Sequence, residues 1–278
     1  MRSNLAPHIN LKNSLLIMRK DWKVNLRNKQ ISIPLFILPI VFGVFIPILM
    51  LMGVLYAPNE YLSAFGGKEY LISTLSVNPN YNEYLIAADI AAKIMILPYF
   101  LFIPSMITII LSADSFAGEK ERKTMESLAL LPISKTELIL GKVLSAFVPA
   151  LLLSFTFFLL QGIIINLMFL PYLEGNILIF LDLTWLAMIF LLTPSIAFLN
   201  ILMGTMVSSR SKDFKSAQSI TGSFIVPVLG LLFIQLVNPA FLSPPMILLI
   251  TAILLGLILI MLRIAKRLLV IEKLILML

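Results

Sequence analysis

Long apolar windows separated by short polar segments dominate this chain, in which 60% of the residues are hydrophobic and 13% are charged. Six windows contain no Asp, Glu, Lys or Arg: 31–55, 94–113, 143–169, 183–207, 219–237 and 246–262. Each is about long enough to cross a bilayer, which needs roughly 17–25 residues. A soluble protein needs more polar surface than this composition supplies. We therefore expect an all-α integral membrane protein with six transmembrane helices, the last reaching about residue 264.

The segment before the first window has a different pattern. Its apolar residues recur every three or four positions: Leu11, Leu15, Met18, Trp22 and Leu26. This spacing predicts an amphipathic helix within residues 1–30, too charged to cross the membrane. We expect this connecting helix to lie flat at the inner interface, beside a transmembrane domain over 31–278. The alternative is a general anchor that only sets topology.

Basic residues give the orientation. Nineteen of the 21 lie in the N-terminal segment, the 114–142 and 208–218 segments and the C-terminal tail; only Lys68 and Lys93 fall elsewhere. Because basic residues are retained in cytoplasmic loops, both termini are expected in the cytoplasm and the protein in the cell membrane. All seven tyrosines fall in or near segments that this topology places outside. This excess of basic residues in cytoplasmic segments accounts for most of the net charge of +7. The charge therefore does not indicate a nucleic acid partner.

The 56–93 segment is the largest expected extracytoplasmic piece. Gly66-Gly67 and Asn78-Pro79-Asn80 mark turns within it. It is too short for a domain with its own core, so we expect a small cap over the outer mouth. Prolines in four spans predict kinks: Pro98, Pro104, Pro149, Pro194 and Pro227.

The windows contain neutral polar residues but no ionisable side chain. Four amides are candidates for the transport path: Gln161, Asn166, Asn200 and Gln235. They either form interhelical hydrogen bonds or contact substrate. Proton-coupled carriers usually keep an ionisable group inside the membrane, so the pattern disfavours that mechanism.

The chain lacks the residues that most catalytic or energy-coupling sites need. It has no cysteine, a single histidine (His8) and no GxxxxGK[ST] phosphate-binding loop. Metal clusters and nucleophile–histidine pairs are thereby excluded, and no cofactor or enzymatic activity is expected. If energy drives this protein, it comes through a partner, which needs a docking surface.

One segment stands out as such a surface. Residues 114–142, the elbow segment, carry five acids and five bases between two apolar windows. Glu119 with Lys123, and Arg122 with Glu126, have the spacing of ion pairs on a helix. The helix is expected to stop at Leu131, because the residue before a proline avoids helical angles. Ser134 and Glu137 have the spacing of a capping box for the next helix. The pattern predicts a stiff helix–break–helix elbow; a solvated turn is the alternative.

The elbow segment resembles the cytoplasmic segment of the type-2 ABC exporter permeases. The resemblance is carried by ten positions: Phe116, Glu119, Glu121, Thr124, Leu128, Pro132, Ser134, Glu137, Gly141 and Lys142. Lys123 departs from it, since the family often has glycine there. Six spans, inward termini and a flat N-terminal helix agree with the same family.

The resemblance implies a permease subunit of an ATP-driven exporter, without an ATPase site of its own. Its partners are expected to be two ABC ATP-binding subunits, a second copy or a homologous permease, and membrane lipids. The residues expected to couple it to the ATPase are Phe116, Glu119, Glu121, Thr124, Met125, Glu126, Leu128, Pro132, Ser134, Glu137 and Lys142. The alternatives are a secondary carrier or channel not driven by ATP, and a membrane-embedded enzyme. No pattern identifies the substrate.

Overall fold

The computed structural model describes residues 10–125 and 133–275. All regular structure in these ranges is helical. Six helices in them are long and apolar enough to cross a membrane: Lys29–Tyr56, Glu83–Glu121, Thr136–Met168, Leu183–Arg210, Phe214–Val237 and Pro244–Ile264. The predicted all-α membrane fold with six spans is confirmed.

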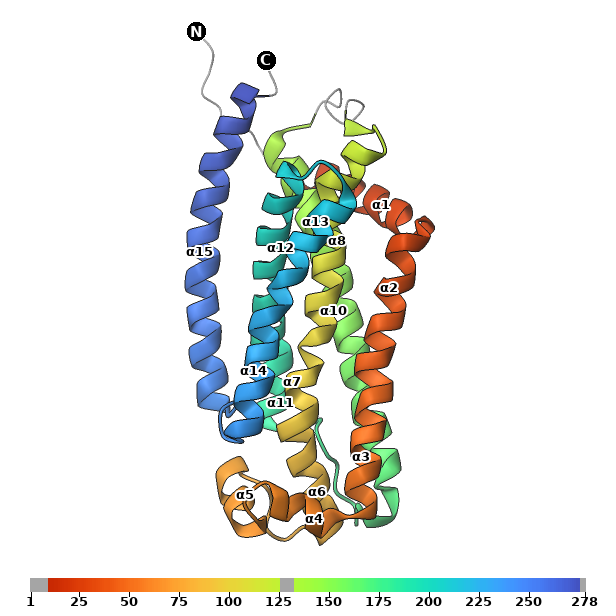
Figure 1. The fold of residues 1–278 in the computed structure, drawn as a ribbon, viewed down its shortest axis with the longest axis vertical. Coiled ribbons are helices and arrows are strands. Elements are labelled where there is room, and N and C mark those ends of the chain that lie inside the picture. The colour runs from red at the N-terminus through yellow and green to blue at the C-terminus, as the bar shows by residue number, and fades with distance from the viewer. Residues whose placement is uncertain (1–9, 126–132, 276–278) are drawn as a thin grey trace.

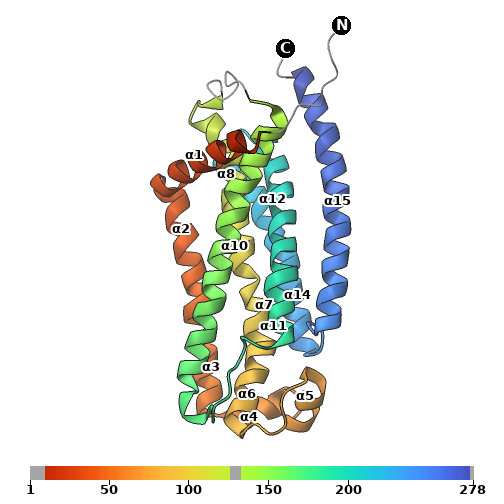
Figure 2. The same cartoon turned by 180° about the vertical axis from the view of Figure 1, so that it is seen from behind.

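The six spans run lengthwise beside one another, and the two ends of the bundle are covered differently (Figures 1 and 2). Helix α1 (Leu11–Arg27) lies across one end of the bundle. The short helices α4 (Pro58–Ala64) and α5 (Lys68–Leu75) cover the other. We call these the α1 end and the α4 end. The turn predicted at Gly66-Gly67 joins α4 to α5, where both glycines have positive φ, 103° and 94°.

Prolines shape three spans in the same way. The first span consists of α2 (Lys29–Ile40), a π-helical turn at Val41–Phe45 and α3 (Ile46–Tyr56). Similar turns occur at Ala92–Ile96 and Met188–Leu192, and each of the three ends two residues before a proline. A proline ring clashes with the carbonyl four residues earlier. A wider turn moves that carbonyl away, which explains the pairing of each bulge with a proline.

The second span lies at the centre of the bundle and starts earlier than expected. It comprises α6 (Glu83–Ala91), the π turn at Ala92–Ile96, α7 (Leu97–Phe100) and α8 (Phe102–Glu121). Its N-cap is Asn82, whose side chain accepts a hydrogen bond from Leu85 N. Asp89 and Lys93, which the sequence analysis placed in a loop, are therefore buried inside this helix.

The remaining spans surround the second one. They are α10 (Lys135–Met168); α11 (Leu183–Ala187) continued through the π turn by α12 (Thr193–Arg210); α13 (Phe214–Gly222), the 3₁₀ turn Ser223–Ile225 and α14 (Val226–Val237); and α15 (Pro244–Ile275). Helices α8 and α12 pack closely, because Gly204 lies against Ser112. A 3₁₀ turn at Leu170–Tyr172 and an irregular strap, residues 173–182, connect α10 to α11.

Candidate coupling site at the α1 end

The elbow segment leads from the end of α8 to the start of α10; α1 packs on α10 and reaches α8 through the Lys20–Glu119 pair. The predicted capping box is confirmed: Ser134 Oγ accepts from Glu137 N (3.2 Å), and Ser134 N donates to Glu137 Oε2 (3.0 Å). The same carboxylate also holds the start of α1. It accepts hydrogen bonds from Asn10 N (2.7 Å) and Asn13 Nδ2 (3.1 Å). Glu137 thus joins the N-termini of two helices.

Gly141 lets α1 cross α10 at backbone distance. A Cβ atom on Gly141 would lie 2.7 Å from Ile17 Cβ and 2.9 Å from the carbonyl oxygen of Ser14. Ser14 Oγ donates to the Glu137 carbonyl (3.0 Å) at the same crossing. Trp22 Nε1 donates to the Ser145 carbonyl (2.8 Å) further along. The expected connecting helix is therefore bound to the start of α10 along most of its length.

A buried ion network joins α1, α8 and α10. Lys142 is 1% exposed, and its Nζ lies 3.2 Å from Glu119 Oε2 and 3.6 Å from Asp21 Oδ2. Lys20 pairs with Glu119 and with Asp21. Two lysines and two carboxylates thus neutralise one another. Burial raises the pKa of the Asp21 carboxyl above its usual value, while Lys142 and Lys20 oppose that shift.

The side chain of Lys142 also contacts the elbow at the turn before Glu119. Its Nζ donates to the Ser115 carbonyl and lies 4.9 Å from the centre of the Phe116 ring. Carbonyl oxygens and aromatic faces both stabilise a buried ammonium group. Phe116, Glu119 and Lys142, predicted from their motif positions, are therefore brought together around one charge.

The predicted ion pair between Glu119 and Lys123 is wrong, and Glu126, the predicted partner of Arg122, lies outside the described residues. Helix α8 ends at Glu121, ten residues before the expected stop. Thr124 N donates to the Glu119 carbonyl (2.9 Å) and Lys123 N to the Lys120 carbonyl (3.0 Å), with Lys123 at φ 57°. This is the hydrogen-bond pattern of a helix C-terminus that favours glycine at the left-handed position. Lys123 occupies that position.

Arg122 forms its ion pair with a residue earlier in the chain, Asp114 of α8, because the helix ends at the residue before it. Its two terminal nitrogens donate to the Asp114 carboxylate at 2.9 and 3.0 Å. Gly118 makes room for this bidentate pair, since a Cβ there would lie 1.8 Å from Asp114 Oδ1. Glu119 likewise pairs with Lys20 and Lys142 rather than with Lys123.

A second set of contacts ties the end of α8 to the segment between α12 and α13. Glu121 Oε2 accepts from Phe214 N (3.0 Å) at the start of α13. Lys120 Nζ donates to the Ser209 and Ser211 carbonyls at the end of α12. Ser208 Oγ accepts from Phe116 N and Ala117 N and donates to the Ala113 carbonyl. Glu121, expected at a partner contact, thus binds this chain's own α13.

The structure gives fewer contacts for the other predicted coupling residues. Thr124 is exposed, and its hydroxyl donates to the Glu119 carbonyl (3.3 Å); Met125 is half-buried. Glu126, Leu128 and Pro132 lie outside the described residues. Sequence reasoning missed Lys20, Asp21, Lys120 and Ser208. One signal was present for Asp21, which is the only acid among seven bases in the first 30 residues.

The four candidate pathway amides divide into two pairs. Asn166 and Gln235 hold connecting segments: Asn166 exchanges hydrogen bonds with both backbone groups of Leu178, and Gln235 with Lys93, Pro239 and Leu242. Gln161 and Asn200 are buried, and both polar atoms of the Gln161 amide and Nδ2 of Asn200 lack partners within the described part of the chain. The second pair therefore keeps buried polar atoms that the described residues do not satisfy.

Comparison with known proteins gives one finding. The model of the ABC-2 family transporter protein matches residues 15–246, which include α1 from Leu15 onward, the elbow segment and the first five spans. Comparisons with curated proteins and with solved structures found no match. The match covers most of the chain and agrees with the resemblance carried by the elbow segment. The chain belongs to the ABC-2 family of ABC transporter membrane proteins.

Proposed function

We propose that this protein is the permease subunit of an ATP-driven exporter and that its α1 end receives the motion of separate ATP-binding subunits. The family establishes a membrane subunit of an ABC transporter. The proposal adds the direction of transport, two ATP-binding subunits per complex, and a second copy or a homologous permease. It also places the protein in the cell membrane with the α1 end and both termini in the cytoplasm, as the positive-inside bias favours.

The observation that carries the proposal is the ion network around Lys142. The elbow segment begins and ends at the α1 end, and the two helices that flank it are held to α1 by Lys142, Glu119 and Glu137. A push on the elbow therefore moves α1, α8 and α10 as one unit. Lys120 and Glu121 pass the same displacement to α12 and α13. Motion at one end reaches five helices through buried contacts.

These contacts refine the role of Glu121. A carboxylate that binds Phe214 N inside the chain positions α13 rather than docking a partner. In this proposal the partner contacts the exposed residues that follow α8, among them Lys123 and Thr124, together with the rest of the elbow. Glu119, Glu137 and Lys142 are positioning residues, because they hold the elbow against α1.

The test uses the complex purified from native membranes through a tag on this chain. An ATP-binding subunit should co-purify, and the complex in liposomes should hydrolyse ATP. Lys142→Met should leave the ATP-binding subunit attached but reduce substrate-stimulated hydrolysis about tenfold or more. Lys23→Met, on the exposed face of α1, is the matched control and should leave hydrolysis unchanged. Failure to recover any ATP-binding subunit from intact complexes would overturn the proposal.

A secondary carrier is the second candidate, favoured by one observation. The sequence analysis found no ionisable group in the spans, yet the structure buries Asp89 and Lys93 within the second one. Buried charges in a span often serve ion-coupled transport. Transport by the purified chain in liposomes that is driven by a proton gradient and needs no ATP would favour the carrier.

A further inference from the structure

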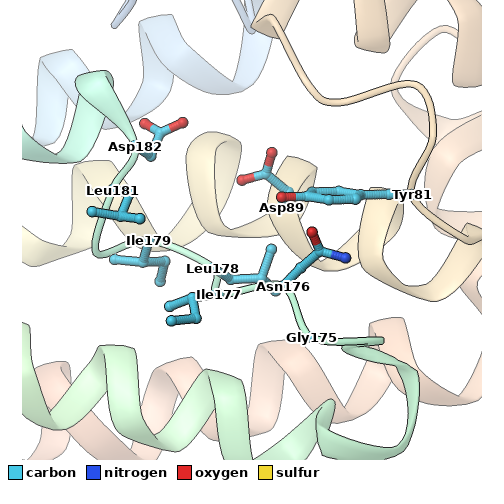
Figure 3. A pocket seen from close by; sticks show the side chains of 9 residues that line it. All are labelled: Tyr81, Asp89, Gly175, Asn176, Ile177, Leu178, Ile179, Leu181 and Asp182. Atoms are coloured by element: carbon cyan, nitrogen blue, oxygen red, sulfur yellow. The ribbon is translucent and has the colours of Figure 1, made fainter.

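A cavity of about 360 Å³ lies at the α4 end, between the strap and the start of the second span. Figure 3 shows its wall: Tyr81, Asp89 and Asn176 lie in one part of it, Asp182 lies further along, and Ile177 and Ile179 supply apolar surface. The cavity is remote from the coupling site. None of the contacts proposed for ATP coupling uses these residues.

A buried lysine organises the charges beside this cavity. Lys93 is 3% exposed, and its Nζ lies 3.0 Å from Asp89 Oδ2 and 2.8 Å from Asp182 Oδ2. It also donates to the Leu75 carbonyl (3.2 Å). An ammonium group has three N–H donors. Lys93 therefore has no donor left for a ligand, and the three side chains together carry one net negative charge.

The two carboxylates are not equivalent. Asp182 Oδ1 accepts from Thr184 N (2.9 Å) and Trp185 N (3.2 Å), so both Asp182 oxygens have partners. Asp89 Oδ2 binds Lys93, but Asp89 Oδ1 has no hydrogen-bond or ion-pair partner among the described residues. Asp89 is 6% exposed and lines the cavity. The uncompensated charge thus resides on one carboxylate oxygen at the cavity wall.

The neighbouring groups favour an organic cation over a metal ion. A divalent metal would bind between the two carboxylates, but Lys93 Nζ already occupies that position. A calcium ion also needs six to eight oxygen ligands, and the described residues contain no group of three or more His, Cys, Asp or Glu that could hold a metal. Tyr81 offers an aromatic face, which attracts ammonium groups. Asn176 Nδ2 donates to the Leu173 carbonyl, while its Oδ1 has no hydrogen-bond partner within residues 10–125 and 133–275.

We propose that this cavity binds a primary ammonium group attached to a small apolar body. The ammonium donates to Asp89 Oδ1 and lies near the Tyr81 ring, and the apolar part packs on Ile177 and Ile179. The ammonium can belong to a free amine or to the ethanolamine headgroup of a lipid at the membrane surface. The proposal does not depend on ATP coupling, and the two can fail separately.

The test measures binding of phenethylammonium to the full chain in nanodiscs, by titration calorimetry. The discs contain phosphatidylcholine, whose headgroup has no N–H donor. Wild type should bind the cation saturably and bind its neutral analogue, 2-phenylethanol, at least about tenfold more weakly. Asp89→Asn should weaken cation binding about tenfold or more, because a hydrogen bond to a charged group is lost. Glu69→Gln, an exposed acid of α5, is the matched control and should change nothing.

A second variant keeps the test decisive if Asp89→Asn does not fold. Ile177 lines the cavity yet is 55% exposed, so Ile177→Trp should fill the cavity without disturbing the buried charges. It should abolish cation binding. Repeating the titration in discs that contain phosphatidylethanolamine identifies the source: weaker apparent binding there means that the lipid headgroup competes for the site. Equal binding of cation and alcohol by wild type, or wild-type binding by Ile177→Trp, would overturn the proposal.

Discussion

Each end of this membrane protein buries a lysine between two carboxylates, but the two clusters differ in what surrounds them. At the α1 end, Lys142 contacts Glu119 and Asp21, and Lys20 supplies the second positive charge. At the α4 end, Lys93 contacts Asp89 and Asp182 without such a second lysine among the described contacts. The first cluster is balanced and joins three helices. The second keeps a net negative charge beside a cavity.

This difference underlies the two roles proposed above, a structural link between helices at the α1 end and a cation-binding site at the α4 end. Full charge balance leaves nothing for a ligand to neutralise, so the α1-end cluster can only hold its helices together. An uncompensated carboxylate oxygen beside a cavity creates an attraction for a cation. The α4-end cluster also borders the strap, where Glu174 and Ile179 adopt positive φ, a conformation that non-glycine residues rarely adopt.

Removal of each central lysine gives the largest expected difference. Lys142→Met should destabilise the protein by about 3–5 kcal/mol, because it leaves buried carboxylates without their main partner. Lys93→Met should be less damaging, because water or a cation from the cavity can reach Asp89. Thermal unfolding of the purified variants in detergent, with and without phenethylammonium, measures both effects. Added cation should raise the midpoint of Lys93→Met but not that of Lys142→Met; a larger loss at Lys93 would contradict the comparison.

Gly141 gives the next largest effect. Gly141→Ala should cost about 1–3 kcal/mol, because the new Cβ meets backbone and Cβ atoms of α1 that cannot move without displacing the helix. Gly230→Ala in α14 is the matched control, since a Cβ there meets nothing within 4 Å. It should be neutral or slightly stabilising, as alanine has the higher helix propensity. Thermal unfolding midpoints compare the two; equal effects would show that the α1 crossing is loose.

The sequence predicted features that depend on local pattern. Hydropathy gave the six spans, the three- and four-residue spacing gave α1, and Ser134 with Glu137 gave the start of α10. Each of these signals is complete within one stretch of chain. The role of Gly141 became visible only when α1 was placed against it.

Charges that neutralise one another across the fold were not predictable in this way. The charge-free window places the start of the second span too late, because Asp89 and Lys93 interrupt the apolar sequence there. As an i, i+4 pair completed by Asp182, they are buried together. The pairs Lys20–Glu119 and Asp21–Lys142 join residues about a hundred positions apart, which no local spacing can indicate. The end of α8 at Glu121 gives no strong sequence signal, because lysine stands where the resemblance leads one to expect glycine.

The smallest expected effect on stability concerns Lys123 and its counterpart at the α4 end, Ser76. Lys123 and Ser76 both adopt left-handed backbone conformations, with φ 57° and 52°, and both are exposed. For a residue with a Cβ this conformation costs roughly 1–2 kcal/mol, whereas glycine adopts it freely. Lys123→Gly at the α1 end and Ser76→Gly at the α4 end should therefore each stabilise the protein by up to about 1 kcal/mol. Ser73→Gly, inside helix α5, is the matched control and should cost about 0.5–1 kcal/mol. Thermal unfolding midpoints in detergent compare the stability of the three variants with that of wild type. A loss at Lys123→Gly with a gain at Ser76→Gly would mean that the Lys123 side chain stabilises the elbow through contacts beyond its backbone conformation.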